Sequence, residues 1–82
     1  FGNTAVIEGS ASGASWVSVL VEFSDGSFYR SASPLVYAGP TAEFYIEVTG
    51  NADPVSYLVY ITDEKPSYGG TYIPLAMEAG GF

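Results

Sequence analysis

The residue types that usually carry catalysis are scarce in this sequence. It contains no His and no Cys, so the common acyl-transfer triads and ordinary zinc or haem sites have no ligands or bases to build on. A carboxylate pair drawn from Glu22, Glu43 and Glu47 has the chemistry for glycoside hydrolysis. Glu43 and Glu47, however, fall on the outward face of an alternating strand. So small a domain also cannot enclose a substrate cleft of typical size. We expect no enzyme and no cofactor.

Calcium is the one metal for which oxygen ligands are present. The loops supply Asp25, Asn51, Asp53, Asp63 and Glu64, and carboxylate and amide oxygens suit this ion. No Asp-x-Asp-x-Asp run brings them together. The same residue types form turns, and this is the preferred interpretation, so no metal site is predicted.

Large apolar side chains on the outward faces of strands are the most informative group. Three interpretations remain open: loops cover these residues, they contact another protein, or they stack on sugar rings. Tyr and Trp are enriched at protein interfaces, and we favour a protein contact surface. Its candidate residues are Trp16, Leu20, Tyr45, Leu58, Tyr60 and Tyr72.

Alternation of apolar and polar residues dominates the chain and predicts strands. Val17, Val19, Val21 and Phe23 share one face of the clearest example, and Asp25-Gly26 after it is a strong hairpin signal. Pro34 precedes a short apolar run that is predicted to be an edge strand, and the tail 80–82 is expected to be mobile. The predicted strands are 4–8, 15–24, 28–32, 35–38, 42–49, 55–62 and 71–79.

Strands this short, with turn signals between them and no helical period, predict an all-β fold. We expect a small immunoglobulin-like or fibronectin-like antiparallel β-sandwich of six or seven strands. The 82 residues make a single domain, 1–82. A domain of this size without disulfides is marginally stable, which favours oligomerisation as additional support.

Seven small, uncharged residues, 9–15, separate the first two predicted strands. Hairpins commonly need about 2–5 residues, whereas seven extended residues reach about 23–25 Å. This is enough to cross between two sheets about 10 Å apart, or to reach a neighbouring molecule. Residues 1–15 are therefore either a sheet-crossing strand with its joint or a strand exchanged between subunits, with Val6 and Ile7 in the contact.

Composition restricts the partners. The net charge is −7 and Arg30 and Lys65 are the only cations, so nucleic acid and anionic membranes are poor partners. The longest apolar run is far shorter than the roughly 20 residues that span a bilayer. The chain starts at Phe1 rather than Met, which we interpret as removal of a leader after export or as a fragment boundary.

Together these features favour a non-enzymatic structural subunit of an extracellular assembly, such as a pilus-like filament, a fibre or a virion shell. Its predicted partners are copies of itself or a companion subunit, at the cell surface or outside the cell. One alternative is a monomeric adhesin or carbohydrate-binding module, for which a glycan is the ligand. A second is a globular pilin head that docks on a separate helical subunit.

Overall fold

The computed structural model describes residues 3–63, 65 and 76–82, and within them the chain is all-β. Six strands and no helix are present in this part of the chain. The strands are β1 (Thr4–Ala11), β2 (Trp16–Phe23), β3 (Phe28–Pro34), β4 (Ala42–Thr49), β5 (Pro54–Thr62) and β6 (Ala76–Gly81).

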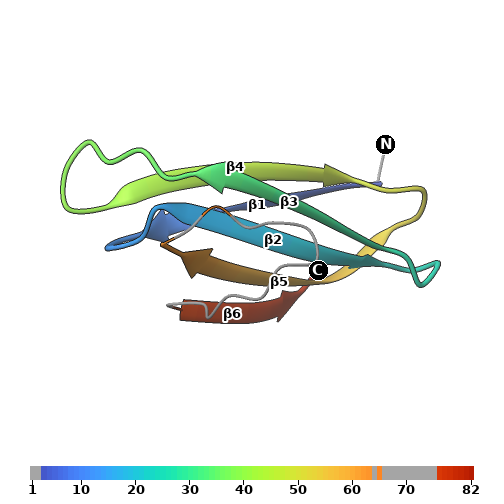
Figure 1. Cartoon of the computed structure of the whole chain (residues 1–82). Coiled ribbons are helices and arrows are strands. Elements are labelled where there is room, and N and C mark those ends of the chain that lie inside the picture. Colours follow the sequence, from blue (N-terminus) through green and yellow to red (C-terminus); the bar gives the residue numbers. More distant parts are fainter. Residues whose placement is uncertain (1–2, 64, 66–75) are drawn as a thin grey trace.

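The strands form two antiparallel sheets that pack together. One sheet has four strands in the order β3-β2-β5-β6, and the other contains β1 and β4 alone. Figure 1 shows β4 and β6 at opposite sides of the molecule, with β2 and β5 between them. The predicted all-β antiparallel sandwich is confirmed, whereas the immunoglobulin-like or fibronectin-like subtype stays a prediction.

The alternation of side chains along each strand determines which residues form the core. Val17, Val19 and Val21 have no solvent exposure, and Phe23 is only 1% exposed. From the facing sheet, Ile46 and Val48 complete the packing, because alternate residues of a strand point to the same side. The core is thus centred on β2 and lies between it and the β1-β4 pair.

The hairpin predicted at Asp25-Gly26 is present and joins β2 to β3. Gly26 has a φ of 85°, a left-handed conformation that glycine adopts at no steric cost. The Asp25 carboxylate accepts hydrogen bonds from the Ser27 backbone N–H at 3.0 Å and from the Ser27 hydroxyl. These bonds favour the ionised carboxylate, so they lower the pKa of Asp25.

The small-residue segment divides between strand and loop. β1 extends through Ala11, so only residues 12–15 link it to β2 in the other sheet. Within the single chain β1 pairs with β4 from Thr4 opposite Thr49 to Ala11 opposite Ala42. The chain therefore has the sheet-crossing arrangement in cis, and exchange of the same strand between subunits stays a prediction.

The connection from β3 to β4 differs from the sequence prediction. Residues 35–38 form no strand, because this segment must leave the four-stranded sheet and cross to the other one. Leu35 is buried there, and its N–H donates to the Ser15 carbonyl at 2.9 Å. The Tyr37 hydroxyl donates to the Ala14 carbonyl at 2.6 Å and accepts from the Ala14 N–H at 2.9 Å. Tyr37 thereby fastens this crossing to the β1–β2 link.

The end of the chain forms a strand that the sequence prediction ended two residues earlier. β6 runs through Gly81, and the Phe82 N–H donates to the Val55 carbonyl at 3.1 Å. The Phe82 and Tyr57 rings lie 5.2 Å apart between centroids. Residues 80–82 therefore pair with β5, and their mobility stays a prediction. Residues 71–75 of the predicted strand 71–79 lie outside the described residues.

Candidate interaction surfaces

The predicted contact residues fall on two different outer faces. Trp16, Leu20, Leu58 and Tyr60 share the outer face of the four-stranded sheet, since Leu20 lies opposite Leu58 and their side chains alternate with the core. Tyr60 is buried and the other three are partly buried. None of these four residues is fully exposed, whereas Phe28 and Met77, on the edge strands of the same face, are 58% and 60% exposed.

Two details concern Trp16 and its neighbour Ser18 on that face. The Lys65 ammonium lies 5.8 Å from the centre of the Trp16 ring, a cation–π distance. Ser18, on the same face, is 1% exposed, and its hydroxyl has no hydrogen-bond partner in the described part of the chain. One face of the indole is thus occupied by Lys65, which reduces the surface available for stacking on a sugar.

The outer face of the β1-β4 pair is more open and is acidic. Val6 is 44% exposed and Tyr45 is 58% exposed, and Glu8 and Glu47 lie opposite Tyr45 and Val6. The Tyr45 hydroxyl donates to the Glu47 carboxylate at 2.8 Å. That bond raises the pKa of Tyr45, because ionising the phenol would lose the donor beside a negative charge.

One further candidate, Ile7, is buried like Tyr60, and another lies outside the described residues. Ile7 points into the core, where it is 6% exposed, because odd-numbered residues of β1 face the other sheet. Tyr72 lies outside the described residues. Sequence reasoning also missed exposed apolar residues, because several are in loops or edge strands where alternation gives no guide; they include Phe28, Val36, Val55 and Met77.

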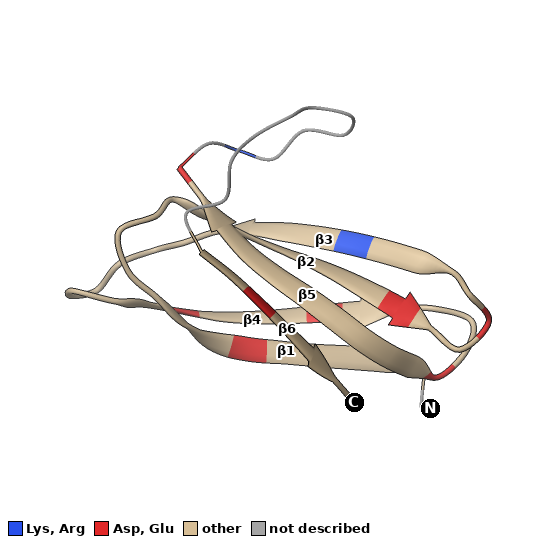
Figure 2. Ribbon diagram, turned by 90° about the horizontal axis from the view of Figure 1, so that it is seen from below, with Lys and Arg blue, Asp and Glu red and all other residues tan. Residues whose placement is uncertain are grey.

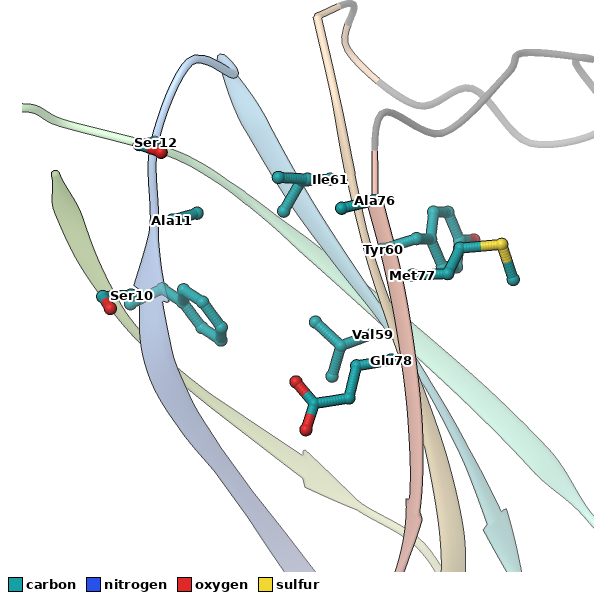
Figure 3. Close-up of a pocket in the computed structure, with 10 residues that line it drawn as sticks. Ser10, Ala11, Ser12, Val59, Tyr60, Ile61, Ala76, Met77 and Glu78 are labelled. Atoms are coloured by element: carbon teal, nitrogen blue, oxygen red, sulfur yellow. The ribbon is translucent and has the colours of Figure 1, made fainter.

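The feature that the sequence did not reveal is a groove between β1 and β6. It has a volume of about 360 Å³ and is floored by Val59 and Ile61 of β5, with Phe44 and Ala11 on the β1-β4 side. Figure 3 shows Ala11, Val59 and Ile61 pointing into this space, while Tyr60 and Met77 point away from it. Core side chains of the sandwich are therefore reachable from outside along this side of the molecule.

Acidic groups surround the molecule. Figure 2 shows Asp and Glu on both sheets and a basic residue on β3, the strand that contains Arg30. In the described residues no group of three or more acidic residues is close enough to hold a metal ion. The turn before β3 and the loop before β5 do meet, since the Ser24 N–H donates to the Asp53 carbonyl at 2.8 Å, whereas Asp63 follows β5 at the opposite end of the sheet.

Comparison of the chain with protein-family models, with curated proteins and with solved structures found no match. In the described residues, no helix has the length and apolar character needed to cross a membrane. The interpretation of function therefore depends on the surfaces themselves.

Proposed function

We propose that the chain is a non-enzymatic structural subunit of an extracellular assembly, such as a pilus-like filament, a fibre or a virion shell, and that it acts through protein–protein contacts. The observation that carries the proposal is the groove between β1 and β6, which leaves core side chains of a small domain accessible. A second protein surface in that groove would remove apolar area from water. The exposed Tyr45 and Val6 add a further contact area on the neighbouring face.

The composition agrees with this proposal. Only 13% of residues are charged, against about 25% in average proteins, and no disulfide supports the fold. The partners in this proposal are copies of the chain or a companion subunit, at the cell surface or outside the cell. Apolar side chains that a monomer would leave in water are then covered in the assembly.

The second candidate, a monomeric adhesin or carbohydrate-binding module, requires an accessible aromatic platform. Tyr45 offers one, although its hydroxyl is held by Glu47. Trp16 is less suited, because it is partly buried and has Lys65 over its ring. A pilin head that docks on a helical subunit is a variant of the first candidate, in which the contacts are made to a companion.

Light scattering and electron microscopy of the purified chain over a concentration series test the proposal. Ordered filaments or shells are expected. Tyr45→Thr and Leu20→Thr form a matched pair, since each places a strand-favouring polar residue on one of the two outer faces. Loss of particles with Tyr45→Thr alone would map the contact to the β1-β4 face.

A chain that stays monomeric at every concentration would exclude self-assembly. Binding of a companion subunit would then be the remaining form of the proposal. A glycan array with Trp16 fluorescence as the readout would test the carbohydrate alternative, and specific glycan binding by a monomer would overturn the structural proposal.

A further inference from the structure

The two sheets differ in width, and this leaves the inner face of β5 incompletely covered. Val17, Val19 and Val21 of β2 are fully buried, whereas their neighbours Ile61, Val59 and Tyr57 on β5, which point the same way, are partly exposed. The difference arises because β4 contacts β2 and β3 while β1 contacts β5 only sparsely, and in the described part of the chain no third strand of that sheet lies beyond β1.

Most of the residues that border this gap are too small to fill it. On β1 the inward positions nearest the gap are Gly9 and Ala11, and on β6 they are Ala76, Glu78 and Gly80, of which only Glu78 has a long side chain. The Phe44 ring lies against Gly9, where a Cβ would meet its Cζ at 3.0 Å. Apolar side chains from a further strand would therefore complete the layer over Val59 and Ile61.

The hydrogen-bonding phase of β1 shows that its outer edge is free to accept such a strand. The Gly50 N–H donates to the Asn3 carbonyl at 3.0 Å. In an antiparallel ladder this phase directs the backbone groups of odd-numbered β1 residues towards β4, and those of even-numbered residues away from it. The N–H and C=O groups of Val6, Glu8 and Ser10 thus point to an edge that no described strand covers.

Charge around the groove identifies the chemistry of the partner. Glu78 lies opposite Val59 on β6 and points to the same side, and Figure 3 shows its carboxylate directed towards the groove. Glu8 and Glu43 line an adjoining cavity that shares Ser10 and Phe44 with the groove. A second copy of this chain would bring seven further net negative charges, so a basic strand fits better than a self-donated one.

We propose that the groove binds an extended strand of a companion polypeptide by β-strand addition to the free edge of β1. Alternate apolar side chains of that strand cover Val59 and Ile61, and its Lys or Arg residues pair with Glu78 and the neighbouring carboxylates. The strand joins β1 and not β6, because a strand added to β6 would extend the four-stranded layer without covering β5. The proposal rests on the proposed function in that both assign the domain to contacts between proteins.

An inward charge on an edge strand can also act as a guard against sheet-to-sheet pairing. Glu78 in that role would repel apolar strands of any charge by its desolvation cost. In the proposed role it distinguishes basic from acidic strands. The two roles therefore differ in how binding responds to the charge of the added strand.

The probe is a fluorescein-labelled peptide of about nine residues that alternates Val with Thr and has Lys near both ends. The reference probe has Glu in the same positions. Fluorescence anisotropy with the full chain at low micromolar concentration is expected to give binding by the Lys probe, and binding by the Glu probe at least about tenfold weaker. The difference should shrink as salt rises, because ions screen partly exposed charges.

Ser10→Pro and Ala79→Pro are the matched edge variants. Each removes one N–H that points away from the paired strand, Ser10 on β1 and Ala79 on β6, where the Phe82-to-Val55 bond sets the phase. Ser10→Pro is expected to abolish binding of the Lys probe, and Ala79→Pro to leave it within about twofold. Glu78→Gln is expected to keep binding while reducing the preference for the Lys probe over the Glu probe.

Ala11→Leu, which fills the groove from β1, provides a second block that keeps every backbone donor. It should weaken binding of the Lys probe about tenfold or more and leave the fold intact. Failure of the Lys probe to bind at about 1 mM, equal binding of both probes, or loss of binding with Ala79→Pro in place of Ser10→Pro would overturn the inference. Particle formation is scored separately by scattering, so filaments without peptide binding would refute this site and leave the proposed function standing.

Discussion

Val19 and Val59 offer a direct test of whether the inner face of β5 is open. They are the same residue type, they lie opposite each other on adjacent strands, and both point into the sandwich. Val19 has no solvent exposure, whereas Val59 is partly exposed and lines the groove. The same substitution to Ala at the two positions therefore isolates the effect of the gap.

The Val19→Ala substitution removes two buried methyl groups and leaves a cavity. At about 0.8 kcal/mol for each buried carbon the transfer loss is about 1.6 kcal/mol, and the cavity raises the total loss of unfolding free energy to about 2–3 kcal/mol. At Val59 water already reaches the side chain and can fill the space. We expect Val59→Ala to cost about 1 kcal/mol or less.

Urea unfolding followed by Trp16 fluorescence measures both variants against the parent chain. The midpoint should fall for Val19→Ala by at least twice the fall for Val59→Ala, and the slope of free energy against urea should be the same in all three proteins. Equal losses would refute the reasoning, because they would mean that Val59 is as well enclosed as Val19. A larger loss at Val59 would have the same meaning.

Three further predictions follow from single contacts. Tyr37→Phe should lower the unfolding free energy by about 1–3 kcal/mol and speed exchange of the Ala14 amide, because both backbone groups of Ala14 lose their partner. Gly80→Ala should cost about 1–3 kcal/mol in urea unfolding, since its Cβ would collide with the Tyr57 ring. Asp25→Asn should weaken the fall in stability on acidification, because the lowered folded pKa of Asp25 gives stability above its unfolded pKa that is lost as pH falls through the folded value.

The Gly80 and Asp25 substitutions each have a control in the same chain. Gly39→Ala, where a Cβ would meet no atom within 4 Å, should change stability by no more than about 0.5 kcal/mol. Asp53→Asn is the control for Asp25→Asn, because it removes one carboxylate charge from the adjoining loop. A Tyr37→Phe protein with parental stability, or an Asp25→Asn protein with an unchanged acid midpoint, would show that the corresponding hydrogen bonds add nothing.

Much of the sandwich could be predicted from the sequence. Alternation identified Val17, Val19, Val21 and Phe23 as one buried face, because a period of two places those side chains on the same side of any strand. Asp25-Gly26 identified the hairpin for a similarly local reason, since Gly26 adopts the positive φ that the turn needs. Both predictions depend only on residues close together in the chain.

Predictions that depended on pairing between distant segments were less successful. The apolar character of 35–38 suggested a strand, but Leu35 and Tyr37 serve the crossing between sheets and make their contacts with residues 14 and 15. The groove was missed because alternation shows that Val59 faces inward without showing what lies opposite. Its only sequence signals are the small residues Gly9 and Ala11, which also suit a simple flexible joint.

The uncovered face of β5 connects the stability of the domain to its proposed binding. If a strand covers Val59 and Ile61 only in the folded protein, binding must raise the unfolding free energy by RT ln(1 + [L]/Kd). With the Lys probe at about one hundred times its Kd, we expect a gain of about 2.7 kcal/mol in urea unfolding. The same concentration should add little to the Ser10→Pro protein. A gain that persists in Ser10→Pro would place the peptide elsewhere on the surface and contradict strand addition at β1.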